Sequence, residues 1–245
     1  MLHPSLSGVR ACLFDAGGTL VHPDWPRLSA IAKMVSGSVF DPTEMSAAFA
    51  AMLRDVGVEM QREGFALPEE MKRPHWTFNR MYRALGLDEA TCASVIERLG
   101  ISHLERHVWC GLDPDAPRVI DELKRQGLIV AVISNTEDGR LRESLEAAGI
   151  SDRFDLLVDS HLVGYRKPEP AIFQFALNAL KLEASEAAYV GDSYAHDALA
   201  ASRIGLRGIL LDPLNLHSES ISPRLNSLGE LIGGDSNSAS HNAPN

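Results

Sequence analysis

The chain of 245 residues has room for one large domain or two modest ones, and 45% of its residues are hydrophobic. Its formal net charge of -10 argues against nucleic acid or an anionic membrane as the main partner. Three scattered cysteines without a Cys-x-x-Cys pair indicate a reducing compartment. We find no signal peptide and no membrane-spanning stretch, so the sequence predicts a cytoplasmic protein; the oligomeric state stays open.

The first predicted element is a buried strand in residues 9–20. The apolar run from Ala11 to Phe14 stops at Asp15, and two glycines and a threonine follow. A short apolar run that stops at Gly-Gly predicts a strand leading into a tight loop. Alone, such an aspartate is more often a turn residue. In an open parallel sheet, however, the carboxyl end of a strand is where ligands bind.

Residues 27–105 predict only helices. Apolar residues recur at helical spacing within 28–35, 45–53, 76–85 and 95–99, with breaks near Gly37, residues 64–68 and Gly86. We expect an inserted unit of four or five helices here.

From residue 114 onward, helices and strands alternate. We predict helices over 117–126, 137–148, 170–180 and 195–203, strands over 128–133, 154–158, 187–190 and 208–211, and a short last helix within 225–232. Such alternation predicts an α/β fold with a doubly wound parallel sheet. The expected domains are a core of residues 1–21 and 110–232, an all-helical cap of residues 22–109, and a polar tail over 233–245.

Polar residues follow several of the predicted strands, and a parallel sheet would bring them to one crevice. They are Asp15, Ser134, Asn135, Asp192, Ser193 and Asp197, with Lys167 in the loop between two of these motifs. Clustered carboxylates are best tolerated around a hard cation such as Mg²⁺. A lysine and backbone amides suit a phosphate, and a carboxylate can attack phosphorus. The set therefore predicts phosphoryl transfer. A simpler reading of Ser134 and Asn135 is a helix cap.

Four motifs in order resemble the haloacid dehalogenase-like (HAD) superfamily, in its type with a helical-bundle cap after the first motif. They are Phe-Asp-x-x-Gly-Thr-Leu, Ile-Ser-Asn, Arg-Lys-Pro-Glu-Pro and Gly-Asp-Ser-x-x-x-Asp, and the resemblance extends to residue 232. It implies a Rossmann-like core and Mg²⁺-dependent hydrolysis of a small phosphorylated substrate through an aspartyl-phosphate.

The resemblance also implies residue roles. Asp15 would be the nucleophile and Lys167 would steady the charge of Asp15 and of the phosphoryl group. The remaining roles would be Mg²⁺ ligation by Asp15, Asp192 and the Gly17 carbonyl, phosphate binding by Ser134, Asn135, Gly18 and Thr19, and support of the metal site by Asp197 and Ser193.

One position departs from the family pattern. Most phosphatases of this superfamily carry a general acid and base, an aspartate, where this chain has Gly17. Such a group contributes about 10²–10⁴-fold in rate. His22, His196 or a water chain could replace it.

Two other functions stay open because of Gly17. One is a metal-free 2-haloacid-type dehalogenase, although those enzymes usually have an aromatic residue at this position. The other is a catalytically weak HAD-fold binding protein.

Overall fold

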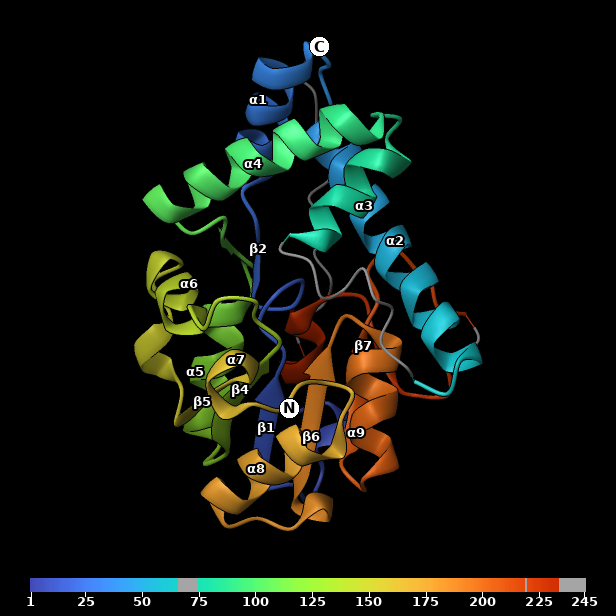
Figure 1. Ribbon diagram of the computed structural model, residues 1–245. Helices are drawn as coiled ribbons and strands as arrows, with labels where there is room; N and C mark the ends of the chain where they lie inside the picture. The colour runs from blue at the N-terminus through green and yellow to red at the C-terminus, as the bar shows by residue number, and fades with distance from the viewer. Residues whose placement is uncertain (66–74, 219, 234–245) are drawn as a thin grey trace, which may run out of the picture.

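The centre of the molecule is a six-stranded parallel sheet with strand order β5-β4-β1-β6-β7-β8 (Figure 1). The computed structural model describes residues 1–65, 75–218 and 220–233. The strands are β1 (Ala11–Phe14), β4 (Ile129–Ser134), β5 (Leu156–Asp159), β6 (Ala187–Gly191), β7 (Arg207–Leu211) and β8 (Arg224–Leu225). This order confirms the predicted α/β fold. Of the six strands in this sheet, β8 was not predicted, because it is only two residues long.

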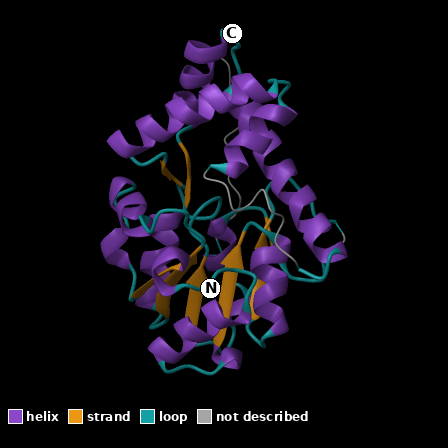
Figure 2. Ribbon diagram, in the orientation of Figure 1, coloured by secondary structure: helices purple, strands orange, loops and turns teal. Residues whose placement is uncertain are grey.

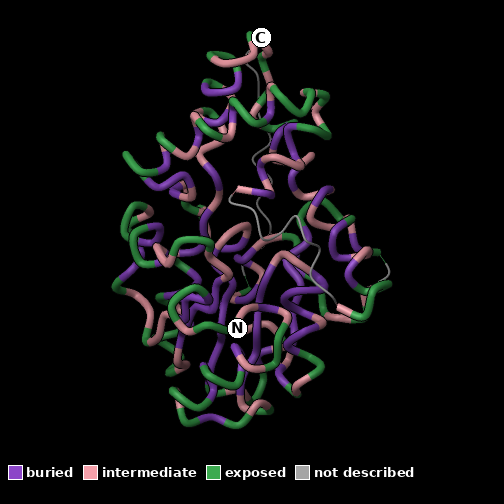
Figure 3. The backbone as a smooth tube through the Cα atoms, in the orientation of Figure 1, coloured by how far each residue is buried: buried purple, intermediate pink, exposed green. Residues whose placement is uncertain are grey.

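Helices cover both faces of this sheet (Figure 2). The even-numbered residues of β1, Cys12 and Phe14, pack with α5 (Ala116–Arg125) and α6 (Leu141–Ala147). The odd-numbered residues Ala11 and Leu13 pack with α8 (Pro170–Leu180) and α9 (Leu199–Arg203). Because successive side chains point to opposite faces, a strand covered on both sides must be apolar throughout. Figure 3 accordingly shows the central strands as buried.

Four helices make up the cap in the described residues: α1 (Trp25–Ser36), α2 (Pro42–Arg62), α3 (Trp76–Ala84) and α4 (Glu89–Glu105). Aspartate side chains cap three of them: Asp24 accepts from the Arg27 amide, Asp41 from that of Thr43, and Asp88 from that of Thr91. The cap has a hydrophobic core of its own, which includes Leu28, Met45, Phe78 and Leu99.

A short antiparallel ribbon joins the cap to the core. Its strands are β2 (Val21–Pro23) and β3 (Trp109–Leu112), which were not predicted because each is only three or four residues long. Both predicted domain boundaries, at residues 21–22 and 109–110, fall inside this ribbon.

The cap lies over the carboxyl ends of the strands, and α2 extends down beside the core (Figure 1). At this contact Gly57 faces Ala195: a Cβ on Gly57 would lie 3.3 Å from the Ala195 Cβ. A larger residue at position 57 would therefore push α2 away from the turn of residues 194–198, which contains both Ala195 and Asp197.

The predicted helix over 137–148 is wrong at its start, because α6 begins only at Leu141. Residues 135–140 form a loop in which Gly139 has φ +77, a left-handed conformation that interrupts a helix. The Asp138 carboxylate accepts a hydrogen bond from the Arg140 amide, and Asp159 accepts one from the Leu141 amide. Ser134 and Asn135 are therefore not helix caps.

The predicted helix over 195–203 has two parts, a π-helical turn, η5 (Tyr194–Ala198), and α9. The predicted last helix is shorter than expected, because Leu225 belongs to β8 and only η6 (Leu228–Ile232) is helical. Short elements complete the core: η1 (Pro4–Leu6), η3 (Ser151–Arg153), α7 (Ser160–Val163) and η4 (Ala184–Glu186).

Residues 66–68 of one predicted break and residues 234–245 of the predicted tail lie outside the described residues. Among the helices that are described, none combines the length and apolar character that a bilayer crossing requires.

Candidate active site

A cavity of about 520 Å³ lies between the carboxyl ends of the strands and the cap. Eight of the residues predicted for the site line it: Asp15, Gly17, Ser134, Asn135, Lys167, Asp192, Ser193 and Asp197. They come from the ends of β1, β4 and β6 and the residues that follow them, from the loop between α7 and α8, and from η5. The parallel sheet thus brings together motifs that are far apart in the sequence.

Lys167 is the centre of this group. Its Nζ lies 2.5 Å from Asp15 Oδ1, 2.7 Å from Asp197 Oδ1 and 3.0 Å from the Tyr189 hydroxyl. Burial by itself would lower the pKa of Lys167, but the carboxylates of Asp15 and Asp197 outweigh it and hold this pKa well above the usual value. The lysine therefore stays charged. Tyr189 was not predicted, because an apolar strand interior gives no sign that one hydroxyl reaches the site.

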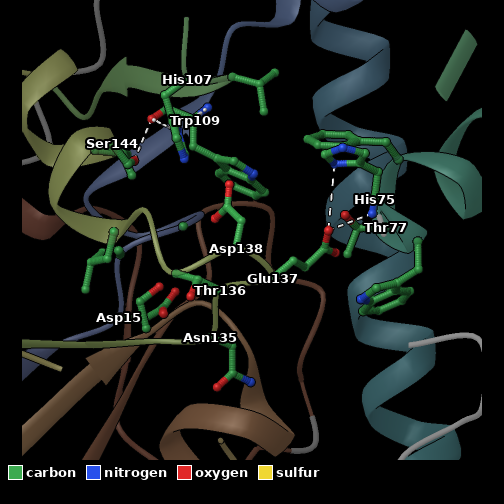
Figure 4. Close-up of a pocket in the computed structure, with 18 of the residues that line it drawn as sticks. Asp15, His75, Thr77, His107, Trp109, Asn135, Thr136, Glu137, Asp138 and Ser144 are labelled. Atoms are coloured by element: carbon green, nitrogen blue, oxygen red, sulfur yellow. Dashed lines mark hydrogen bonds and ion pairs between the residues drawn. The ribbon is translucent and has the colours of Figure 1, made fainter. Parts of the chain in front are cut away.

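Asn135 lines the cavity, and its amide group bonds the backbone of Lys167. Its Nδ2 donates to the Lys167 carbonyl over 2.9 Å, and its Oδ1 accepts from the Lys167 amide over 2.8 Å. Figure 4 shows this side chain directed away from Glu137 and Asp138. Asn135 therefore positions the lysine, and its predicted contact with phosphate stays a prediction.

Three carboxylates share this buried space. Asp15, Asp192 and Asp197 each offer an oxygen, and these oxygens lie within 4.8 Å of one another. Burial, opposed in part by Lys167, raises the pKa of Asp15 to about 6. Burial, with the charges of Asp15 and Asp197, raises the pKa of Asp192 well above its usual value. One lysine does not balance three carboxylates, so an all-oxygen donor set of this kind fits a hard cation such as Mg²⁺.

The two oxygens of Asp197 already have protein partners. Oδ1 accepts from Lys167, and Oδ2 accepts from the Ser193 amide over 3.0 Å. Ser193 in turn caps the π-helical turn, since its hydroxyl accepts from the His196 amide over 3.4 Å. These bonds hold the Asp192 loop in place beside Asp15.

Gly18 and Thr19 do not belong to the described lining of the cavity. Gly18 has φ +89, and a Cβ there would overlap the Asp192 carboxylate, so only glycine allows Asp192 to approach. Its amide donates to the Val21 carbonyl over 2.8 Å. Thr19 is fully buried, and its hydroxyl finds no partner among the described residues. Their role in phosphate binding stays a prediction.

The space beside Gly17 is filled by an aromatic ring. A Cβ at Gly17 would lie 3.1 Å from Cζ3 and 3.2 Å from Cε3 of the Trp109 indole. Trp109 was not among the residues predicted for the site. Position 109 is adjacent to Gly17 only because the β2–β3 ribbon pairs residues on either side of the cap.

The two histidines considered as substitutes for the missing acid lie in different places. His22 is in β2, with Nε2 3.6 Å from Asp113 Oδ2, and is not among the described lining residues. His196 lines the cavity, and its Nδ1 lies 3.0 Å from the Ser193 hydroxyl. Burial lowers the pKa of His196 to about 4, so at neutral pH it is uncharged and a poor proton donor.

The loop after β4 also joins the core to the cap (Figure 4). The His75 amide donates to Glu137 Oε2 over 2.6 Å, and His103 Nε2 lies 2.9 Å from Asp138 Oδ2. Both loop residues were predicted to be helical. Asp159, also missed, supports the loop by accepting from Thr136 Oγ1 and from the Leu141 amide.

A second group of possible metal ligands lies in this contact, namely His103, His107 and Asp138. The Val108 amide donates to His103 Nδ1, and the Trp109 amide donates to His107 Nδ1, each over 3.2 Å. In an uncharged imidazole, the other nitrogen then carries the proton. The geometry therefore makes Nε2 of His103 a donor to Asp138 rather than a metal ligand.

Comparison with known proteins gives one consistent family. A family model described as haloacid dehalogenase-like hydrolase matches residues 9–205. A ribulose-1,5-bisphosphate 5-phosphatase of Halopiger xanaduensis is 28% identical over 83% of this chain and 84% of its own. An (S)-2-haloacid dehalogenase 4A of Burkholderia cepacia is 24% identical over 92% of this chain and 94% of its own.

Among solved structures, a putative HAD-hydrolase of Bacillus subtilis bound to magnesium has a TM-score of 0.64. It is 20% identical, and the match covers 91% of this chain and 97% of the other. The haloacid dehalogenase-like hydrolase domain-containing protein 3 of four animals, Homo sapiens among them, aligns over a shorter part of the chain. This chain spans only 49–62% of the length of these relatives.

Proposed function

The chain belongs to the haloacid dehalogenase-like hydrolases, and on that premise we propose that it hydrolyses a small phosphorylated metabolite with the help of Mg²⁺. The observation that carries the proposal is the buried group of Asp15, Asp192 and Asp197 around a single lysine. This group combines a nucleophile, a positive clamp and an oxygen-rich site for a cation, which are the parts that phosphoryl transfer requires.

Asp15, Asp192 and the Gly17 carbonyl would hold Mg²⁺, which when bound supplies charge neutralisation to the phosphoryl oxygens. Asp15 attacks phosphorus, so that an O–P bond forms on its carboxylate while the bond to the leaving group breaks. Lys167 stabilises the negative charge at this point, with Asn135 fixing its backbone. Ser134, buried at the end of β4, donates to a phosphoryl oxygen. Water then breaks the aspartyl-phosphate.

Gly17 has no side chain that could protonate the leaving group. The Trp109 ring occupies the space where the side chain of an acid at position 17 would lie. The phosphatase from Halopiger xanaduensis supports a phosphorylated substrate, since it matches over most of both chains. We expect this enzyme to act as a phosphatase with slow turnover of alkyl esters.

The screen that tests the proposal uses phosphorylated metabolites together with acetyl phosphate, each with and without Mg²⁺. Hydrolysis that depends on Mg²⁺ and is lost in Asp15→Asn would support it. Binding of Mg²⁺ and a phosphate analogue without turnover would instead support a catalytically weak binding protein with the HAD fold.

A second candidate is metal-free dehalogenation, favoured by the aromatic ring beside Gly17 and by the dehalogenase of Burkholderia cepacia. That reaction also forms an ester on an aspartate. Release of halide from a 2-haloacid in the presence of a chelator would support this candidate and contradict the phosphatase.

A further inference from the structure

Three aromatic rings form one wall of the cavity above Asp15. They are Phe49 from α2, Phe78 from α3 and Trp109 from β3, hereafter the aromatic wall. The ring centroids lie 5.7 Å apart for Phe49 and Trp109, 5.8 Å for Phe78 and Trp109, and 5.8 Å for Phe49 and Phe78. These separations are typical of aromatic pairs that hold one another in place.

Trp109 is the member of the wall that remains accessible. Phe49 and Phe78 are buried, whereas Trp109 is half-buried. Its amide donates to His107 Nδ1 over 3.2 Å, and its carbonyl accepts from the Ser144 hydroxyl over 2.6 Å. These two bonds fix the backbone of Trp109, and the contacts with Phe49 and Phe78 hold its ring beside Gly17.

At position 17 itself there is no proton donor, because glycine has no side chain. A leaving group that departs from Asp15-bound phosphorus must then take the electron pair of the broken P–O bond and leave as an anion. A phenolic oxygen does this far more easily than an alkyl oxygen, because its ring delocalises the charge. A phenolic leaving group thus fits both the aromatic wall and the absence of an acid at position 17. Its ring packs against the wall, and its oxygen can depart without being protonated.

We propose that the aromatic wall selects aryl phosphates, that is, phosphate esters of phenolic oxygens, as the substrate class of this site. The inference rests on the proposed function for its chemical step. In that step Asp15 forms an O–P bond, the P–O(aryl) bond breaks, and the phenolate takes its proton from solvent. Water then adds at phosphorus, which releases inorganic phosphate and restores the Asp15 carboxylate. A cavity of about 520 Å³ has room for such a ring.

Binding is tested first, independently of turnover. Phenylphosphonate and methylphosphonate differ by the ring, and neither contains a P–O–C bond that can be hydrolysed. With Mg²⁺ present, we expect the wild-type protein to bind phenylphosphonate about three- to tenfold more tightly by calorimetry, the range of an aromatic contact. Trp109→Leu should abolish this difference, and Trp109→Phe should retain most of it.

Trp25→Leu is the matched control, because Trp25 contacts Phe49 at 5.5 Å but is not among the described lining residues. It should leave the ring preference unchanged. Equal binding of the two phosphonates by the wild-type protein, or an equal loss of preference in Trp25→Leu and Trp109→Leu, would overturn the assignment of the wall.

Turnover is tested with four substrates that separate the ring from the leaving oxygen. Phenyl phosphate has both a ring and a stable anion, benzyl phosphate only a ring, acetyl phosphate only a stable anion, and glycerol phosphate neither. We expect kcat/KM to be highest for phenyl phosphate. Trp109→Leu should lower kcat/KM for phenyl phosphate, through a higher KM, by a larger factor than for acetyl phosphate. If acetyl phosphate is hydrolysed but phenyl phosphate is not preferred, the substrate class is wrong. If none of the four substrates is hydrolysed although phenylphosphonate binds preferentially, the proposed function is wrong. The aromatic wall is then a binding site for aromatic ligands without the proposed catalysis.

Discussion

The indole of Trp109 lies against the backbone of Gly17, with ring atoms 3.1–3.5 Å from the place a Cβ would take. Gly17 is not among the glycines with positive φ, so its backbone suits other residues. A side chain at position 17 is therefore constrained by the space that the ring occupies, not by the conformation of the loop.

Restoring an acid at Gly17 should therefore require room as well as a carboxyl group. We expect Gly17→Asp alone to gain little, because the new side chain must displace a ring held by Phe49 and Phe78. Gly17→Asp combined with Trp109→Leu should raise turnover of glycerol phosphate more than that of phenyl phosphate, toward the 10²–10⁴-fold typical of such groups. Steady-state kinetics of both single variants and the double variant measures this. If the double variant melts normally and both substrates respond alike, the missing acid does not limit the rate.

Asp15→Asn should abolish turnover and leave the fold intact, since the change is nearly isosteric. The matched control is Asp121→Asn, because Asp121 is exposed and its Oδ1 lies 2.5 Å from Arg153 Nη1; this variant should turn over substrate normally. After acid quenching, wild-type protein should retain labelled phosphate from acetyl phosphate, and Asp15→Asn should not. Activity above a few per cent in Asp15→Asn would exclude this residue as the nucleophile.

Asp192→Asn should remove the effect of Mg²⁺ on stability. A ligand that binds only the native state raises its stability by mass action, so the melting temperature of the wild-type protein should rise with added Mg²⁺. Without Mg²⁺ the variant should be at least as stable as the wild type, because burial and the charges of Asp15 and Asp197 disfavour an ionised Asp192. Differential scanning calorimetry at several Mg²⁺ concentrations checks both points. An equal Mg²⁺-dependent rise in the two proteins would show that Asp192 is not a ligand.

Asn135→Ala should loosen Lys167 and weaken the fold. The two hydrogen bonds to the Lys167 backbone contribute about 0.5–1.5 kcal/mol each, so the free energy of unfolding should fall by roughly 1–3 kcal/mol. Urea unfolding measures this loss, and kcat should fall with it. Asn178→Ala is the control, because Asn178 is exposed and its side chain accepts a hydrogen bond only from the Gln174 side chain among the described residues. Unchanged stability and kcat in Asn135→Ala would contradict a positioning role.

Stability should decrease as the pH falls from about 6.5 toward 4, and His107 should contribute to that decrease. Burial is the main cause that lowers the pKa of His107 from 6.5 to about 4. Between these values the unfolded chain binds a proton that the folded chain does not, so unfolding becomes easier as pH falls, by at most about 1.4 kcal/mol per pH unit. His107→Gln should flatten this part of the profile in urea titrations at several pH values. The exposed His161, replaced by Gln, should leave the slope unchanged; an unchanged slope in His107→Gln would contradict burial as the cause.

Much of the fold was determined by the sequence itself. The apolar run Ala11–Phe14, followed by Asp15 and two glycines, predicted a strand covered on both faces with Asp15 at its end, and the structure has this strand as β1. The same local logic placed Ser134 and Asp192 at strand ends. A parallel sheet brings such ends together whatever the details of packing, so eight of the predicted residues could be placed around one cavity without coordinates, whereas Gly18 and Thr19 are not among its described lining.

The tertiary structure alone decided how those residues are held and what faces them. The Asn135 bonds to Lys167 and the Tyr189 hydroxyl on its Nζ join segments that no local pattern connects. The start of α6 depends on Gly139 and on Asp159 from a neighbouring strand. The contact between Trp109 and Gly17 depends on how the β2–β3 ribbon closes around the whole cap, because local propensity reports periodicity along one segment and carries no information about which distant side chain fills a given space.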